Sequence, residues 1–384
     1  MRLASATVYA LEIPLVEPFR HSARARSLCD SVVVRVRDEE GTEGFGEGVP
    51  RPYVTGETPD SVLEHLGRLW SCIAGRDLPE LDGIDTLRAI ESWLPTVPLP
   101  GALADHASRS ALETAVLDCL LQRHEVSLGR LLPPVRQRVA YSGVITAGSL
   151  ETALEHARRM KLVGLAQVKV KVGFEDDVAR VHAVRETLGP SVSLRLDANG
   201  AWTMERAVEV TEATAGCDIA SVEQPLPRGP VEELARLRRA VRVPLMADES
   251  LVTLEDADAL IDAKAVDCFN VRVSKCGGLS RSLRIAARAA AAGIGLQVGS
   301  QVGETAILSA AGRHLAAHLP EVAFVEGSYG TLLLTEDVSA EGIHFGHRGE
   351  APVLTGPGLG IRVLEDRLRK YAREVLELGP GGAS

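Results

Sequence analysis

The segment Val168–Val172 reads Val-Lys-Val-Lys-Val and shows the strict two-residue alternation of a β-strand. Successive side chains of a strand point to opposite faces, so Lys169 and Lys171 share one face. Taken alone, this pattern is also typical of an edge strand with a solvated lysine face. If the lysines instead point into a closed sheet, each ammonium group makes its neighbour harder to charge and lowers its pKa. That arrangement favours Lys171 as a proton-transfer residue, with Lys169 tuning it.

Outward from this segment, residues 138–330 alternate short Val, Ile and Leu runs with amphipathic stretches. Such alternation predicts strand-helix-strand units and a parallel sheet. Eight runs indicate a closed (β/α)8, TIM-like barrel, and we expect Asp176–Thr187 to be one of its covering helices. The runs are Val139–Val144, Gln167–Lys171, Val192–Asp197, Ile219–Glu223, Pro244–Asp248, Cys268–Val273, Gly295–Gly299 and Ala323–Glu326.

One polar residue stands near the end of each successive run, at steps of 25 to 27 residues. Units of equal length place these residues at equivalent positions, and in (β/α)8 enzymes the carboxyl ends of the strands form the active-site rim. Strand-terminal turn residues are the alternative explanation for such positions. The rim residues predicted in this way are Lys171, Asp197, Glu223, Asp248, Lys275, Ser300 and Glu326.

Asp197, Glu223 and Asp248 are expected to converge from three adjacent strands. Three carboxylates at close range repel one another strongly unless a cation lies among them. All-oxygen ligation suits a hard divalent ion, so we infer a Mg²⁺ site, with Mn²⁺ as a substitute. A carboxylate cluster neutralised by arginines at the rim is the alternative.

Lys275 follows Lys171 by four strand-helix units, which places the two lysines on opposite sides of an eight-stranded barrel. A divalent ion bound to a substrate carboxylate stabilises the enolate that forms when an α-proton leaves. Two lysines that flank such a carboxylate predict enolisation chemistry.

The composition excludes several other classes of protein. The 384 residues carry a net charge of −10 and no basic run, which argues against nucleic acid as a partner. The uncharged stretch 289–303 has 15 residues and is interrupted by glycines, so it is too short to cross a membrane. No secretion signal opens the sequence, and we expect a cytoplasmic protein.

Several short motifs resemble the enolase superfamily, specifically its muconate cycloisomerase-like (mandelate racemase/muconate lactonizing enzyme) group. These motifs are Val168–Gly173, Leu196–Trp202, Val222–Pro225, Ala247–Ser250 and Asn270–Gly278. The resemblance extends to residues 1–125, where three strand-like runs (Leu3–Leu15, Ser31–Arg37 and Thr42–Val49) precede helical segments from Pro59 onward. It implies an enolase-type modified barrel at 126–340, an N-terminal α+β capping domain at 1–125 and a C-terminal segment at 341–384 that returns to the capping domain.

The resemblance also implies residue roles. Asp197, Glu223 and Asp248 would be Mg²⁺ ligands, Lys171 and Lys275 would be the general acid/base pair, and Lys169 would be an auxiliary lysine. Asn199 and Glu249 would lie just outside the ligands. Substrate choice in this superfamily is attributed to capping-domain loops, here Glu17–His21 and Arg51–Glu57. The substrate-binding residues expected are Arg20, Arg51, Tyr53, Ser300 and Glu326.

The expected function is a Mg²⁺-dependent enolising enzyme for a small-molecule carboxylate, of the cycloisomerase (lactonizing) type, acting as a homo-oligomer. Alternatives are a racemase or epimerase of N-acyl amino acids, dipeptides or proline derivatives, and an o-succinylbenzoate synthase-like dehydratase. Gly299–Gln301 stands where mandelate racemase-like members carry a histidine base, which disfavours that branch. Val325–Ser328 lacks the Asp-x-Asp of dipeptide epimerases, which disfavours dipeptide epimerisation.

Two further classes of function are weaker alternatives. A lysine with a lowered pKa is also a nucleophile, so a Schiff-base lyase on the same barrel would use Lys171 or Lys275, but it leaves the three carboxylates unexplained. A scaffold protein that kept the fold and lost the chemistry would not need all three lysines and all three carboxylates.

Overall fold

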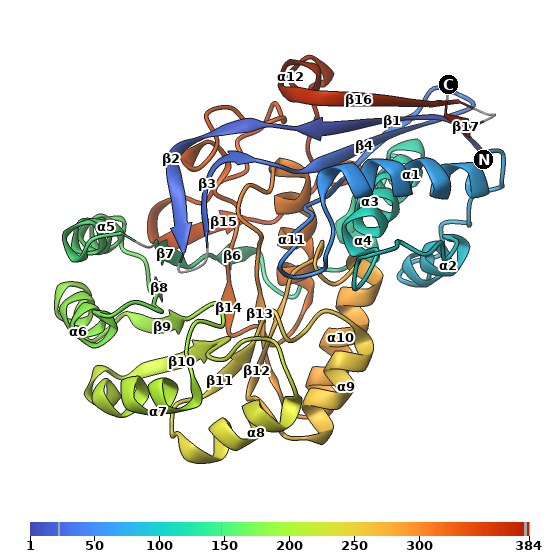
Figure 1. Ribbon diagram of the computed structural model, residues 1–384. Helices are drawn as coiled ribbons and strands as arrows, with labels where there is room; N and C mark the ends of the chain where they lie inside the picture. Colours follow the sequence, from blue (N-terminus) through green and yellow to red (C-terminus); the bar gives the residue numbers. More distant parts are fainter. Residues whose placement is uncertain (22–23, 147, 380–381, 384) are drawn as a thin grey trace.

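The computed structural model describes residues 1–21, 24–146, 148–379 and 382–383. Figure 1 shows a strand-rich part that carries both ends of the chain, lying against a larger part in which helices surround a curled sheet. The larger part confirms the predicted α/β barrel class, and the strand-rich part is the α+β cap that was expected at the N-terminus.

The cap is built on a five-stranded sheet with the order β17-β16-β1-β4-β5, in which neighbouring strands are antiparallel. Its outer strands β16 and β17 come from the end of the chain, so the C-terminal segment completes the N-terminal sheet. A separate hairpin, β2 (Ile13–His21) and β3 (Arg24–Cys29), extends toward the barrel (Figure 1). The sheet strands are β1 (Leu3–Leu11), β4 (Val32–Asp38), β5 (Glu43–Gly48), β16 (Ala372–Gly379) and β17 (Gly382–Ala383).

Helix α3 (His106–Arg123) lies directly on strand β5 because β5 carries glycine at every second position. A Cβ atom added at Gly46 would lie 2.0 Å from the Ala111 carbonyl oxygen, and one at Gly48 would lie 2.0 Å from that of Ala107. Only glycine permits this close backbone approach. The contact holds the first turn of α3 at the barrel, where the His106 ring bonds the Lys275 carbonyl oxygen at 2.6 Å.

The barrel sheet has eight strands in the order β14-β13-β12-β11-β10-β9-β8-β7, and every neighbouring pair is parallel. The Ser142 amide donates to the Val325 carbonyl oxygen at 2.8 Å, which links the start of β7 to β14. The strands are β7 (Gly143–Ile145), β8 (Gln167–Lys171), β9 (Ser193–Asp197), β10 (Ile219–Glu223), β11 (Leu245–Ala247), β12 (Cys268–Val271), β13 (Gly295–Val298) and β14 (Phe324–Val325).

One of the predicted barrel runs is divided. Residues 138–140 form β6 (Arg138–Ala140), which pairs antiparallel with β15 (Glu350–Pro352), and only the second half of the run enters the barrel as β7. The cap run Leu3–Leu15 is similarly divided into β1 and the start of β2. Both divisions depend on partners that are distant in sequence.

The helices cover the outside of the barrel (Figure 1). The expected helix at 176–187 is α6, and the cavity-distant face of its apolar stripe buries Val181 and Val184. The barrel helices are α5 (Leu150–Val163), α6 (Asp177–Leu188), α7 (Met204–Ala213), α8 (Val231–Ala240), α9 (Leu254–Asp262), α10 (Leu279–Ala291) and α11 (Ala306–His318). The others are α1 (Pro59–Ile73), α2 (Asp85–Trp93), α4 (Leu128–Leu131) and α12 (Glu365–Tyr371).

Buried carboxylates of the cap hold the first turns of barrel helices. Glu47 on β5 accepts hydrogen bonds from the amide and hydroxyl of Thr305 and from the Leu308 amide, at the start of α11. Glu113 on α3 accepts from the Ser280 amide at the start of α10. Helix N-termini attract negative charge, so these contacts fix the cap above the barrel rim.

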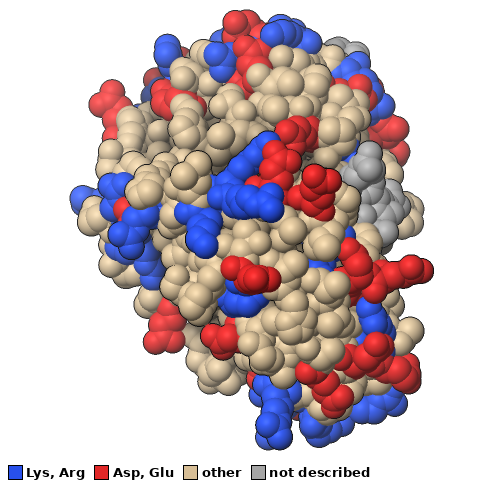
Figure 2. Space-filling view, turned by 90° about the vertical axis from the view of Figure 1, so that its left-hand side faces the viewer, with Lys and Arg blue, Asp and Glu red and all other residues tan. Residues whose placement is uncertain are grey.

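Basic and acidic side chains alternate on the face drawn in Figure 2, with no large area of a single sign. Within the described ranges, no helix has the length and apolar character needed to span a lipid bilayer. On that face, the surface agrees with the absence of a basic run in the sequence.

Candidate active site

The carboxyl ends of the barrel strands bring the predicted lysines and carboxylates into direct contact. Lys171, the last residue of β8, donates to Asp197 Oδ2 at 2.6 Å, and Asp197 is the last residue of β9. Lys169 lies 3.0 Å from Asp197 Oδ2 and donates to Glu223 Oε2 at 3.0 Å and Glu326 Oε2 at 2.8 Å. Both lysine side chains are buried and point inward, so β8 is not an edge strand with a solvated lysine face.

The expectation that the two lysines lower each other's pKa is wrong for Lys169. Burial lowers the pKa of Lys169, but the Asp197, Glu223 and Glu326 carboxylates outweigh burial and hold that pKa well above its ordinary value. Burial also opposes ionisation of Asp197, yet Lys169 and Lys171 hold the pKa of Asp197 far below its usual range. Attraction between unlike charges therefore exceeds repulsion between the lysines here.

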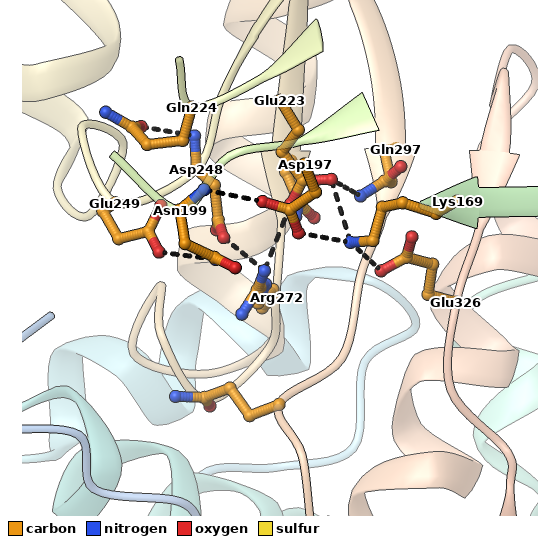
Figure 3. Close-up of polar contacts among 12 residues, drawn as sticks. Lys169, Asp197, Asn199, Glu223, Gln224, Asp248, Glu249, Arg272, Gln297 and Glu326 are labelled. Carbon is orange, nitrogen blue, oxygen red and sulfur yellow. Dashed lines mark hydrogen bonds and ion pairs between the residues drawn. The ribbon is translucent and has the colours of Figure 1, made fainter. Parts of the chain in front are cut away.

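The three predicted metal ligands form a row across β9, β10 and the end of β11, and all three are at most 1% exposed. Lys169 bridges Asp197 and Glu223 (Figure 3). The Arg272 Nη2 atom bridges the next pair, donating to Glu223 Oε1 at 3.2 Å and also to Asp248 Oδ2. Burial and the adjacent Asp197 carboxylate raise the pKa of Glu223, which reflects the repulsion expected within such a row.

Lys275 contacts the other end of this row. Its Nζ atom donates to Asp248 Oδ1 at 2.8 Å, to the Asp248 carbonyl oxygen at 2.7 Å and to the Asn270 carbonyl oxygen at 2.8 Å. Its side chain is 1% exposed. Lys171 and Lys275 therefore flank the carboxylate row from strands β8 and β12, which are four positions apart in the sheet.

The two residues expected beside the ligands do lie there. Asn199 Oδ1 accepts from Lys171 Nζ at 2.7 Å, and Asn199 Nδ2 donates to Glu249 Oε1 at 3.1 Å (Figure 3). Burial and the nearby Asp248 carboxylate raise the pKa of Glu249 to about 7. This chain of contacts fixes the Lys171 ammonium group at the Asp197 end of the row.

The donor set of Asp197, Glu223 and Asp248 fits a hard divalent ion in its chemistry, because all donors are buried oxygens from neighbouring strands. Their arrangement also contains a competing cation, since Arg272 Nη2 already lies between Glu223 and Asp248. As they stand, the described Asp, Glu, His and Cys side chains include no group of three placed to hold a metal. The Arg272 guanidinium and a divalent ion are thus alternative neutralising groups for the same oxygens, and these three residues would hold the ion.

Three buried polar residues in the barrel were not predicted. Arg195 donates to Gln297 Oε1 at 2.7 Å and to Glu326 Oε1 at 2.9 Å, and Gln297 Nε2 contacts Glu223 Oε2 at 3.3 Å. Arg272 is the third. Arg195 stands two residues before Asp197 on β9, so the same alternation that identified Lys169 gives a signal for it.

A cavity of about 210 Å³ opens on this site. Ser300 and Glu326 line it, as expected for substrate-binding residues, and Phe19 of β2 covers it from the cap. Both carboxylate oxygens of Glu326 are bonded to Lys169 and Arg195. Glu326 therefore balances charge below the cavity as well as lining it.

The predicted loop residues behave differently. Arg51 is not an exposed loop arginine: it is 2% exposed, and its guanidinium bonds Asp30 Oδ1 at 2.7 Å together with the carbonyl oxygens of Pro50 and Val302. These contacts hold it between the cap and a barrel loop instead of in the cavity wall. Tyr53 is 40% exposed and does not line the cavity. The side chain of Arg20 lies outside the described residues.

Comparison with known proteins identifies the family. Residues 152–367 match the family model described as enolase C-terminal domain-like. The chain is 33% identical to a hydrophobic dipeptide epimerase of Enterococcus faecalis (94% of this chain and 99% of the relative) and 31% identical to muconate cycloisomerase 1-2 of Acinetobacter lwoffii (97% and 96%). A crystal structure of a dipeptide epimerase from Cytophaga hutchinsonii, complexed with Mg and the dipeptide D-Ala-L-Val, superposes with a TM-score of 0.87 at 27% identity and covers 98% of this chain and 100% of that one. The chain is therefore an enzyme of the enolase superfamily, in its mandelate racemase/muconate lactonizing enzyme-like group, and its relatives are isomerases.

Proposed function

We propose that this enzyme removes the α-proton of a carboxylate substrate, with Lys171 and Lys275 as the two proton-transfer residues. The observation that carries the proposal is the position of these buried lysines at the two ends of one row of buried carboxylates. A group at each end of the row reaches a substrate bound between them from opposite sides. Proton transfer by such positioned side chains is typical of general acid/base catalysis.

Asp197, Glu223 and Asp248 would hold Mg²⁺, the ion present in the Cytophaga hutchinsonii structure, and Mn²⁺ is proposed as a substitute. When bound, the ion supplies charge stabilisation for the enolate that forms at the substrate carboxylate. Lys169 holds Asp197 and Glu223 in position through its two ion pairs. Asn199 orients the Lys171 amine toward the row.

Racemisation or epimerisation is the outcome that uses both lysines, because one removes the proton and the other returns a proton to the opposite face. The relatives named as epimerases support this outcome. Cycloisomerisation, the first expectation from the sequence, is the second candidate and is supported by 31% identity to a muconate cycloisomerase. Dehydration of the o-succinylbenzoate synthase type uses the same enolising step.

Solvent-deuterium exchange tests the proposal. The enzyme is incubated in D₂O with Mg²⁺ and a library of dipeptides, N-acyl amino acids, proline derivatives and muconate, and each compound is examined by mass spectrometry and chiral chromatography. Deuterium at the α-carbon, abolished by exhaustive chelation and restored by added Mg²⁺, is the expected result. Turnover that persists undiminished without metal would contradict the role given to the three carboxylates. Borohydride trapping of a lysine adduct would instead favour a Schiff-base lyase. The expected homo-oligomer stays a prediction, and light scattering measures it.

A further inference from the structure

The cavity wall carries five charged side chains, and four of them are neutralised by other residues of the chain. Lys169 and Lys171 pair with the carboxylate row, and Arg272 pairs with Glu223 and Asp248. Glu326 pairs with Lys169 and Arg195. The fifth is Glu304, and within the described ranges no lysine, arginine or histidine forms an ion pair with it.

Glu304 lies in the loop between β13 and α11, at the edge of the cavity. Its Oε1 atom accepts a hydrogen bond from the Gln301 amide at 2.6 Å, and its Oε2 atom has no hydrogen-bond donor among the residues that the structure describes. Burial raises the pKa of Glu304 to about 8 against the lowering effect of the Gln301 amide, and the Glu47 carboxylate adds to the rise. A second group that donates hydrogen bonds and carries positive charge would therefore stabilise its carboxylate form.

Gln301 presents a further unused acceptor in the same wall. The side chain is 4% exposed, and its Nε2 atom donates to the Val49 carbonyl oxygen at 3.0 Å, which fixes the orientation of the amide. Its Oε1 atom has no partner in the described part of the chain. A buried polar atom without a partner is costly, so this oxygen is an independent indication that a ligand supplies a donor here.

We propose, on the basis of the enolising function above, that Glu304 and Gln301 form a subsite for a positively charged nitrogen of the substrate. The enzyme then takes a carboxylate that also carries an ammonium group. Such a group supplies both the N–H donors that the two side chains lack and the charge that Glu304 lacks. A dicarboxylate such as muconate would instead bring a second negative charge next to Glu304.

Binding of matched compounds tests this subsite. L-alanyl-L-alanine, N-acetyl-L-alanyl-L-alanine and cis,cis-muconate are titrated into the Mg²⁺-loaded enzyme by calorimetry, because the first two differ only in the charge and donors of one nitrogen. The wild type is compared with Glu304→Gln and with the control Glu321→Gln, which alters an exposed glutamate away from the cavity. Thermal unfolding of each variant confirms that it is folded.

The wild type and Glu321→Gln are expected to bind the free dipeptide at least about tenfold more tightly than the acetylated one, since the nitrogen makes a charge-assisted contact. Glu304→Gln should reduce this ratio at least about tenfold. An unchanged ratio, tighter binding of muconate than of the free dipeptide, or binding of none of the three compounds overturns the subsite. Deuterium exchange without this selectivity would leave the enolising function intact, whereas selective binding without exchange would refute that function and leave the subsite standing.

Discussion

Replacement of Lys275 by alanine has a calculable effect on both stability and chemistry. The substitution removes an ammonium group that is 1% exposed and leaves the Asp248 carboxylate without one of its two cationic partners. Loss of one partner of a buried ion pair costs about 3–5 kcal/mol of unfolding free energy. In Lys171→Ala, Asp197 keeps its 3.0 Å contact with Lys169, so we expect a smaller loss of about 1–3 kcal/mol. Urea unfolding measures the difference between the two variants.

Both substitutions should reduce epimerisation by about 10²- to 10⁴-fold, the usual contribution of a positioned acid or base. The two variants should nevertheless differ in their residual chemistry. Each keeps one lysine on one side of the substrate, so each should still exchange the α-proton of one stereoisomer with D₂O. We expect the two variants to exchange opposite stereoisomers, measured by proton NMR on enantiopure substrates.

Lys161→Ala is the matched control, because Lys161 is exposed on α5 and donates only to the Thr187 carbonyl oxygen. It should keep wild-type exchange of both stereoisomers. Full epimerisation by either site variant would refute the two-base assignment. Loss of exchange for both stereoisomers in a variant that remains folded and binds Mg²⁺ would show that the lysines do not act independently.

Three other measurements follow from the structure. Titration of chelated enzyme with Mg²⁺ should raise its melting temperature, because an ion that binds only the folded site stabilises it; no shift would argue against binding at the carboxylate row. Gly46→Ala should cost at least about 1–3 kcal/mol in urea unfolding because its Cβ meets the α3 backbone, whereas Gly312→Ala, in open space on α11, should not destabilise the protein. Burial raises the pKa of Glu47 to about 7 from 4.5, so the folded state keeps a proton that the unfolded state releases. The stability contributed by Glu47 is therefore complete below about pH 4.5 and is lost as pH rises to about 7; an unchanged pH slope in Glu47→Gln would contradict this.

The parts of the fold that could be predicted are those set by local repetition. Equal strand-helix units place Asp197 and Glu223 at equivalent strand ends, and parallel strands bring such ends to one edge, so their proximity follows from spacing alone. The division of residues 139–144 between β6 and β7 could not be predicted in this way. It depends on pairing between Arg138–Ala140 and Glu350–Pro352, and nothing in the shorter segment announces a partner more than 200 residues away.

Arg51 shows a different limit of sequence interpretation. A loop arginine beside proline and tyrosine has the same local pattern whether it reaches a ligand, lies in solvent or is buried. Its place between Asp30 and the Val302 carbonyl oxygen depends on how the cap lies on the barrel. Each of those partners is remote in sequence, so only the assembled fold distinguishes a structural arginine from a substrate-binding one.

The unpredicted residues of the site divide according to whether a periodicity reaches them. Counting back two residues from a rim residue identifies Lys169 from Lys171, and the same step from Asp197 identifies Arg195, because a strand returns to the same face at that interval. Arg272 and Glu304 lie beyond the ends of β12 and β13, where the backbone no longer alternates. Acid/base residues and carboxylates on strands or at their ends are therefore accessible to arithmetic on the sequence. The charge that selects a substrate is carried by loops, and its position has to be read from the folded structure.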